Sequence, residues 1–300
     1  MTDPSVHITF PLVKDPSVKF VAWTTTPWTL PSNLALAVNP NFIYLKIKDL
    51  KRNDTYIVAE CRIQDLYKDP KAYELIEKIK GIDLEGTEYE PLFDFFKERR
   101  ADGCFRVLAG DFVTSESGTG IVHCAPGFGH DDYKLCCEKK IIRPDNPVLP
   151  INENGKFTNE VGKYEGLYFK DADKPIKHDL KHNGRMIMES QYKHSYPFCW
   201  RSDTPLMYRA VDAWFIRVTA IKQDMIKNNS KAYWVPKQVQ EGRFDSWLKN
   251  AEDWCFSRNR FWGNPVPLWV SDDGEEVVCV GSIQELKELS GVAEIKDLHR

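Results

Sequence analysis

The stretch Trp23-Thr24-Thr25-Thr26-Pro27-Trp28-Thr29-Leu30-Pro31-Ser32-Asn33 ends a β-branched run with three adjacent hydroxyl side chains. The run favours a strand, and Pro27 removes a backbone donor where that strand would continue. If strand geometry persists to Thr26, period two places Thr24 and Thr26 on one face and Thr25 on the other. At least one of them then lines whichever pocket the strand borders and offers hydrogen bonds without charge. The alternative is that the threonines serve only as strand formers.

The surrounding sequence is rich in short apolar and β-branched runs. Strands are predicted at Lys19 to Thr26, Leu34 to Val38, Phe42 to Ile47, Thr55 to Ala59, Cys104 to Leu108 and Gly120 to Cys124. Helices are predicted at Lys71 to Lys80, Asp131 to Lys140 and Asp171 to His182, the last ending at the cap Asn183-Gly184. Runs of strands with interspersed helices predict an α+β fold with an antiparallel β-barrel core and peripheral helices.

The composition of the chain changes beyond about Met188, where Trp and Arg become frequent. Further helices are predicted at Ile216 to Lys227, Pro236 to Lys249 and Ile283 to Leu289, with an extended segment at 263–267. We therefore expect one domain at 1–190 and a second, mixed α/β segment at 191–300.

A second informative segment runs from Gly118 to Tyr133 and reads as a strand, a glycine-rich turn and a helix start. A carboxylate at Asp132 can protrude into a pocket and pair with the ammonium of an amino acid. His123, at the end of the strand, can form a wall of the same pocket. The alternatives are that Asp131 and Asp132 only complement the helix dipole, and that His123 is a hydrogen-bonded core residue.

Several other classes of site find little support in the sequence. The turn Gly127-Phe128-Gly129 lacks the third glycine of a dinucleotide loop, and there is no Gly-x-Ser-x-Gly elbow. His130-Asp131 leaves a metal-dependent phosphohydrolase as a minor alternative. In Cys199-Trp200-Arg201-Ser202 a serine stands where a zinc knuckle needs cysteine, so we expect no metal and a buried Cys199 thiol.

Charge and cysteine usage limit the partners and the compartment. The 41 basic and 44 acidic side chains give a formal net charge of -3, so any contact with nucleic acid requires a local patch. No stretch approaches the length of a membrane span, and the N-terminus has no signal-peptide pattern. Eight scattered cysteines without paired spacing fit a reducing cytoplasm.

Together, Thr24 to Asn33 and Gly118 to Tyr133 closely resemble the two signature segments of the editing insertion of isoleucyl-tRNA synthetases. The editing domains of valyl and leucyl enzymes carry Thr-Thr-Arg-Pro instead of the threonine-proline sequence found here. Three later segments, at 194–201, 208–215 and 253–263, are similar to the part of that family where the chain returns to the synthetic domain. The His-x-Gly-His and Lys-Met-Ser-Lys-Ser motifs of aminoacylation do not occur among the 300 residues.

The resemblance implies hydrolytic proofreading of valine attached to isoleucine tRNA, with valyl-adenylate as a further candidate substrate. It places the editing residues on Thr24, Thr25, Thr26, Asn33, His123 and Asp132. Asp132 would hold the ammonium of valine, the threonines would fix the terminal adenosine and the ester, and His123 would restrict the side-chain pocket. Trp28 would form another wall. No cofactor is implied, and the general base stays unassigned.

The partners implied by the resemblance are the valine-carrying 3′ end of isoleucine tRNA and the remainder of a cytoplasmic synthetase chain, without DNA or membrane. Basic residues suited to contact the RNA are Lys139, Lys140, Arg143 and Lys193. The alternative hypothesis is a tRNA-binding module whose catalysis depends on other parts of the synthetase.

Overall fold

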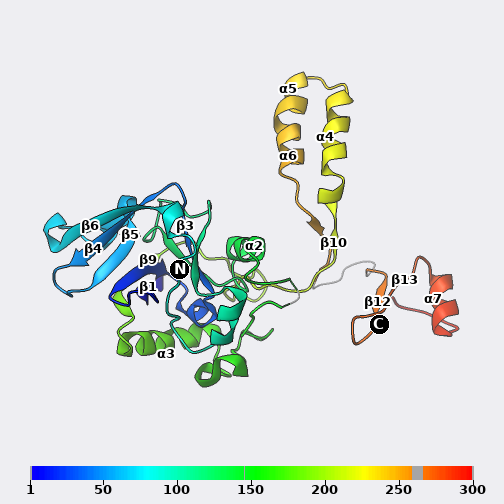
Figure 1. Ribbon diagram of the computed structural model, residues 1–300. Coiled ribbons are helices and arrows are strands. Elements are labelled where there is room, and N and C mark those ends of the chain that lie inside the picture. The colour runs from blue at the N-terminus through cyan, green and yellow to red at the C-terminus, as the bar shows by residue number, and fades with distance from the viewer. Residues whose placement is uncertain (1, 145, 259–265, 299–300) are drawn as a thin grey trace. The chain divides into compact units, whose positions relative to one another are not determined.

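The computed structural model describes residues 2–144, 146–258 and 266–298 (Figure 1). The chain divides into two compact units, residues 1–210 and residues 211–300. We describe each unit by itself. The sequence placed a functional boundary near residue 190, and that assignment stays a prediction.

Unit 1 is organised around a six-stranded sheet in which long-range pairing dominates. The strand order is β6-β4-β5-β2-β1-β9, and every pair is antiparallel except β2 with β5. In chain order the strands are β1 (Thr2–Pro11), β2 (Val18–Thr24), β4 (Ile43–Asp49), β5 (Thr55–Ala59), β6 (Tyr73–Lys80) and β9 (Met186–Lys193). The first and last of them pair along their length, from Thr2 opposite Lys193 to Ile8 opposite Met186.

A three-stranded sheet lies next to β2 and carries part of the candidate site. Its central strand β3 (Ala35–Val38) pairs parallel with β7 (Arg106–Ala109) and antiparallel with β8 (Ile121–Cys124). All four residues of β3 are buried, as expected for an apolar strand covered on both faces. The strand therefore fixes the position of β8 against the interior of unit 1.

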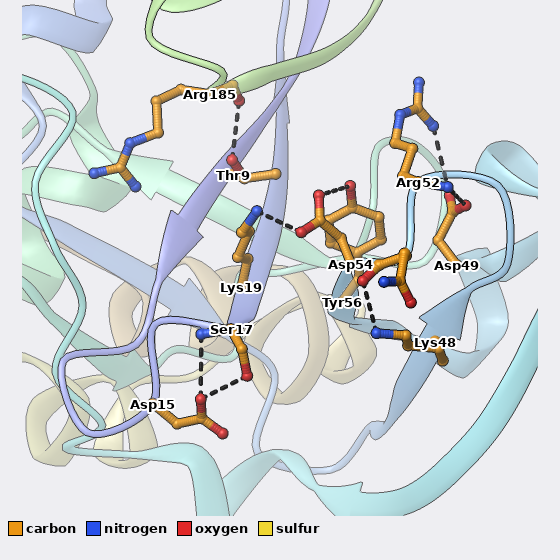
Figure 2. A network of polar contacts seen from close by, with 11 residues as sticks. Thr9, Asp15, Ser17, Lys19, Lys48, Asp49, Arg52, Asp54, Tyr56 and Arg185 are labelled. Atoms are coloured by element: carbon orange, nitrogen blue, oxygen red, sulfur yellow. Dashed lines mark hydrogen bonds and ion pairs between the residues drawn. The ribbon is translucent and has the colours of Figure 1, made fainter.

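The turn between β4 and β5 carries a group of polar side-chain contacts (Figure 2). Asp49 accepts hydrogen bonds from two backbone amides of this turn and pairs with the Arg52 guanidinium at 3.5 Å. Arg52 also donates to the carbonyl of Ile187 in β9 at 2.7 Å, although β1 and β2 separate β9 from β5. The Lys19–Asp54 ion pair at 2.7 Å ties the same turn to β2. The sheet is therefore strongly curled around a second, smaller apolar cluster that includes Ile187.

The mixed α and β character of the chain is as predicted, whereas a closed barrel is not formed by the strands that the structure describes. The outer strands β6 and β9 each pair on one side only within the described sheet, and two of the strand pairs are parallel. The observed architecture is thus two open sheets, one of them curled, in place of the expected antiparallel barrel.

Two helices of unit 1 lie close to the positions predicted from the sequence. Helix α2 (His130–Glu138) begins after the glycine turn, and α3 (Phe169–His182) ends at Asn183, followed by Gly184 at φ 66°. Helix α3 packs on the 3-10 helix η1 (Pro27–Ser32) and on β9. The short helix α1 (Ile63–Leu66) lies at the curled face, where Ile63 and Leu66 contact the second cluster.

The helix predicted at Lys71 to Lys80 is wrong, because Tyr73–Lys80 forms the edge strand β6. Its residues are mostly exposed and include Glu74, Glu77 and Lys78, which favour a helix when no neighbour competes. Here the backbone groups of β4 are available along one side, and pairing with them decides the conformation.

Unit 2 consists of short hairpins and helices. The two-residue strands β10 (Phe215–Ile216) and β11 (Trp254–Cys255) pair with each other. Between them along the chain lie α4 (Lys222–Lys231), α5 (Lys237–Val239), a π-helical turn at Gln240–Phe244 and α6 (Asp245–Lys249). A second hairpin, β12 (Leu268–Val270) with β13 (Val277–Cys279), precedes α7 (Ile283–Ser290). The helix predicted from Ile216 therefore starts later, and most of the extended segment predicted at 263–267 lies outside the described residues.

Two further observations concern membranes and metals. Within the described ranges, no helix is long and apolar enough to cross a membrane, and no three His, Cys, Asp or Glu side chains converge as metal ligands. Cys199 is half-buried, so the prediction of a buried thiol is corrected. It lies in an exposed turn where its amide donates to the Thr204 carbonyl at 2.8 Å.

Candidate functional site

The threonine strip lies at the point where β2 ends. Thr24 is the last residue of the strand, and its hydroxyl accepts a hydrogen bond from the Thr26 amide at 3.1 Å. The hydroxyl oxygens of Thr24 and Thr26 are also 3.1 Å apart. The strand does not persist to Thr26 as the period-two expectation required, and a local turn after Thr24 brings the two side chains together. Thr25, which is half-buried, takes no part in these contacts.

The 3-10 helix η1 adds a third hydroxyl to this side. In such a helix residues three apart lie above one another, which brings Thr29 back to Thr26. The Thr29 hydroxyl donates to the Thr26 carbonyl at 2.8 Å and lies 3.3 Å from the Thr26 hydroxyl. Three hydroxyls thus form one connected strip.

His123 connects this strip to the interior. It lies in β8 opposite Leu36 of β3, and its Nε2 is 2.8 Å from the Thr29 hydroxyl. Its Nδ1 is 3.4 Å from the side-chain nitrogen of Asn33. Burial lowers the pKa of His123 to about 4, so the ring is neutral at physiological pH.

Asn33 completes the network at the end of η1. Its Nδ2 donates to the Ala35 carbonyl at 2.9 Å, and its Oδ1 accepts from the Tyr89 hydroxyl at 2.7 Å. Tyr89 is fully buried, with its ring edge-on to Phe10 and Phe105. A continuous series of polar contacts therefore runs from the threonine strip to a phenol in the core.

Asp132 lies in the first turn of α2, where the helix dipole favours a carboxylate. Its Oδ2 accepts from the Ala125 amide at 2.9 Å, two residues after His123 along the chain. Gly129 makes this approach possible, because a Cβ there would lie 2.7 Å from the same oxygen. Burial raises the pKa of Asp132 to about 6, while the hydrogen bond from Ala125 lowers it. Asp132 and His123 are therefore both held at the C-terminal end of β8.

Trp28 lies in the main core, and its proposed role as a pocket wall stays a prediction. Its side chain is 3% exposed and packs edge-on against Phe128 and Phe169 in the main core. Its backbone amide donates to Asp173 Oδ1 of α3 at 2.9 Å. Trp28 therefore anchors η1 to the glycine turn and to α3.

Sequence reasoning missed three residues that hold this site together: Thr29, Tyr89 and Asp173. Thr29 carried a signal, because it follows Thr26 by the three residues of a 3-10 turn. Tyr89 and Asp173 lie 56 and 145 residues from the groups that they contact, and no local pattern identifies them.

The four basic residues that were predicted to contact RNA differ in whether they form an ion pair within the described part of the chain. Lys139 forms an ion pair with Glu85, whereas Lys140, Arg143 and Lys193 are exposed. Lys140 adopts φ 58° immediately after α2. These residues supply a modest positive surface in a chain that is slightly acidic as a whole.

Chemically, the arrangement combines uncharged hydrogen-bonding groups with one carboxylate. The hydroxyls and amides can orient a polar, uncharged group such as an ester, and Asp132 can hold a cation. Together these groups can hold a small molecule that carries a cation beside a polar, uncharged group.

Residues 18–300 match the sequence model of the tRNA synthetases class I (I, L, M and V), and the chain belongs to that family. Within it, the chain is 61% identical to the isoleucine–tRNA ligase of Tetrahymena thermophila, over 99% of this chain and 28% of that protein. It is 54% identical to the cytoplasmic isoleucine–tRNA ligases of Mus musculus and Saccharomyces cerevisiae, over 99% and 100% of this chain. The resemblance to isoleucyl-tRNA synthetases is thereby confirmed.

The chain spans less than a third of these relatives, 24% of the mouse protein and 28% of the yeast protein. Among solved structures, it is similar to the editing domains of the cytosolic leucyl-tRNA synthetases of P. falciparum and P. knowlesi. Each similarity covers 63% of this chain, and 99% and 96% of the respective editing domains, with TM-scores of 0.46 and 0.45 at 15% and 13% identity.

Proposed function

We propose that this chain carries the proofreading site of an isoleucyl-tRNA synthetase, which hydrolyses the ester between valine and isoleucine tRNA. The observation that carries the proposal is the junction at the end of β8, where the hydroxyl strip and Asp132 are both anchored. The relatives' names place the parent enzyme in the cytoplasm. Unit 1 then corresponds to the editing insertion, and the chain beyond it to the return toward the synthetic domain.

A hydrolytic site meets a physical need in this family. Valine lacks one methylene of isoleucine, and a pocket that accepts the larger side chain cannot exclude the smaller one. Discrimination between these two amino acids by isoleucyl-tRNA synthetases is the usual example of that limit, and a second site that removes the wrong product resolves it.

In the proposed mechanism, Asp132 binds the α-ammonium of valine and the strip of Thr24, Thr26 and Thr29 orients the ester and the terminal ribose. A positioned water attacks the ester carbonyl carbon, the bond to the ribose oxygen breaks, and that oxygen leaves with a proton. Free valine and tRNA are the products. Catalysis comes from placement and hydrogen-bond donors and needs no covalent intermediate.

The contacts of His123 favour a positioning role over that of general base. Both ring nitrogens have protein partners, Thr29 and Asn33, and burial has already lowered the pKa of the ring to about 4. A base with so low a pKa takes up a proton poorly near neutral pH. His123 therefore supports the strip and limits the space beside it.

The proposal is tested by measuring release of labelled valine from valine-charged isoleucine tRNA. The wild-type chain should release valine and spare isoleucine, whereas Asp132→Ala should lose this activity or its selectivity. Asp131→Ala is the matched control, because Asp131 is the exposed neighbouring carboxylate of the same helix turn. A folded chain that binds the tRNA but releases nothing would favour the binding-module alternative.

A further inference from the structure

Tyr89 is the buried end of the polar network described above. Its hydroxyl donates to Asn33 Oδ1 at 2.7 Å, and its ring is fixed between Phe10 and Phe105. The thiols of Cys104, Cys124 and Cys136, which are weak hydrogen-bond acceptors, also contribute to a raised pKa of this hydroxyl. Burial raises the pKa of Tyr89 well above its ordinary value, so the phenol keeps its proton and acts as a donor.

The Ala35 carbonyl and the Tyr89 hydroxyl together fix how the Asn33 amide is oriented. The carbonyl can only accept, so the amide end that lies 2.9 Å from it is the nitrogen, and the other end is the oxygen that accepts the phenol proton at 2.7 Å. The amide nitrogen is then directed to the Ala35 carbonyl at 2.9 Å and to His123 Nδ1 at 3.4 Å. An Asn33 flipped by half a turn would bring its nitrogen against the phenol proton and its oxygen against the Ala35 carbonyl.

The orientation of Asn33 in turn assigns the proton of His123. An amide nitrogen can only donate, so Nδ1 of the neutral ring must accept, and the single ring proton is carried by Nε2. That nitrogen lies 2.8 Å from the Thr29 hydroxyl, which already donates its own hydrogen to the Thr26 carbonyl at 2.8 Å. The Thr29 oxygen is thus free to accept from Nε2, and every donor in the series finds an acceptor.

We propose that Tyr89 is a positioning residue of this site, which acts through Asn33 to hold His123 in the tautomer with the proton on Nε2. This role rests on the proposed function, since it concerns the same site. All donors from Tyr89 to Thr29 then point toward the threonine strip, and the Thr29 hydroxyl is committed to Thr26. Reversal of the His123 tautomer would reverse these donors and disorder the strip.

The test substitutes Tyr89→Phe, which removes one oxygen and keeps the ring. Tyr164→Phe is the matched control, because Tyr164 is also a buried tyrosine whose hydroxyl donates to a side chain, Asp179 at 2.7 Å. Long-range proton–nitrogen NMR correlations of the histidine ring report which nitrogen of His123 carries the proton. In parallel, kcat and KM for valine release are measured on the same proteins.

The wild-type chain and Tyr164→Phe should show the proton on Nε2 of His123. Tyr89→Phe should shift the population toward Nδ1, and kcat should fall by about tenfold with KM little changed, the lower end of the range found when a partner that orients a metal-ligating histidine is removed. Asn33→Asp, which presents only acceptors to the ring, should place a proton on Nδ1 without any change at Tyr89.

An Nδ1 proton in the wild type, or an unchanged tautomer in Tyr89→Phe, overturns the proposal. The NMR measurement does not require activity. The proposed role of Tyr89 can therefore be rejected independently of the proposed proofreading function. A chain that shows the expected tautomers but releases no valine from charged tRNA rejects the proofreading function and supports the role of Tyr89 in orienting His123.

Discussion

Two carboxyl groups and two imidazoles of unit 1 are shifted toward their neutral forms by burial. The pKa of Asp132 rises to about 6 and that of Asp173 to about 7, while the pKa values of His7 and His123 fall to about 4. In each case desolvation of the charged form is the largest cause. The two carboxyl groups make the free energy of unfolding fall as pH rises between their unfolded and folded pKa values, whereas the two imidazoles make it rise.

The pH dependence of valine release should identify Asp132 as the group that must be ionised. Below its pKa of about 6 the carboxyl is neutral and cannot pair with an ammonium, so kcat/KM should fall as pH decreases through that value. His123 titrates near pH 4 and cannot produce this limb. Rates measured between pH 5 and pH 8 check the expectation, and a flat profile across that range would contradict it.

Asp173→Asn should stabilise the chain at neutral pH and not at pH 4. The folded state raises the Asp173 pKa from 3.8 to about 7, so it retains the proton at higher pH than the unfolded chain does. The free energy of unfolding therefore falls as pH rises between these values, by about 2 to 4 kcal/mol for a shift of this size. Asparagine keeps the acceptor for the Trp28 amide without the charge.

Urea unfolding at pH 4 and pH 8 measures this difference. Asp171→Asn is the control, since Asp171 is an exposed position in the same helix. An Asp173→Asn variant that is less stable than the wild type at pH 8 would show that the charged carboxylate is needed by the Trp28 amide.

At the scale of residues, the residue types of the site could be predicted from sequence, but only part of its hydrogen-bond network could. The closeness of Thr24 to Thr26 and the helix that starts just before Asp132 are local features, and both are observed. The contact of Tyr89 with Asn33 depends on the β-bridge between Tyr89 and Leu12 and on the bond from the Tyr89 amide to the Phe105 carbonyl, which no local pattern specifies. The roles assigned to Thr25, Trp28 and the other site residues stay predictions.

At the scale of elements, the close approach of β8 to β5 requires a glycine at position 120. Gly120 has φ 72°, and a Cβ there would lie 2.3 Å from the Cβ of Ala59. Gly166 has a similar φ of 77° but nothing within 4 Å. Alanine substitutions at Gly166 and Gly120 therefore separate the cost of backbone strain from the cost of side-chain crowding.

Gly166→Ala should cost about 1 to 2 kcal/mol from the left-handed backbone alone. Gly120→Ala should cost about 1 to 3 kcal/mol more, because the added methyl overpacks the strand junction. Thermal or urea unfolding gives both values. Combining Gly120→Ala with Ala59→Gly should recover the crowding part, and equal losses in the two single variants would contradict this account.

The elements themselves were predictable where the pattern was local. β2, β3, β5, α2, α3 and α7 lie within a few residues of their predicted positions. The edge strand β6 was mistaken for a helix, because its partner β4 and not its own composition decides its conformation. The closed barrel was wrongly predicted for the same reason. Closure depends on whether the two edge strands pair with each other, and no local sequence pattern specifies this.

At the scale of the whole molecule, the two units differ in how much apolar surface they bury. The buried hydrophobic residues lie almost entirely in unit 1, and the described part of unit 2 contributes only Leu248 and Val280. A unit with so little core has little to oppose the entropy of its chain. Large aromatic side chains there are exposed, including Tyr233 at 93% and Trp247 at 66%.

Hydrogen exchange should therefore be fast in α4 and α6 and slow in β1, β2, β3 and β8. Opening of unit 2 requires little energy, whereas opening of the buried strands requires unfolding of unit 1. Mass spectrometry of exchanged peptides measures both sets in one experiment. Protection of α4 equal to that of β1 would show that unit 2 has its own source of stability.

The pairing of β1 with β9 also bears on how such a unit can be rearranged or inserted. Thr2 lies opposite Lys193, so the backbone enters and leaves the six-stranded sheet on neighbouring strands, about 5 Å apart. A host protein can therefore accommodate this unit within a single loop, with little separation of the two flanking segments. For the same reason a short linker between these positions would yield a circular permutant, in which an exposed turn such as that at Gly86 provides the new ends.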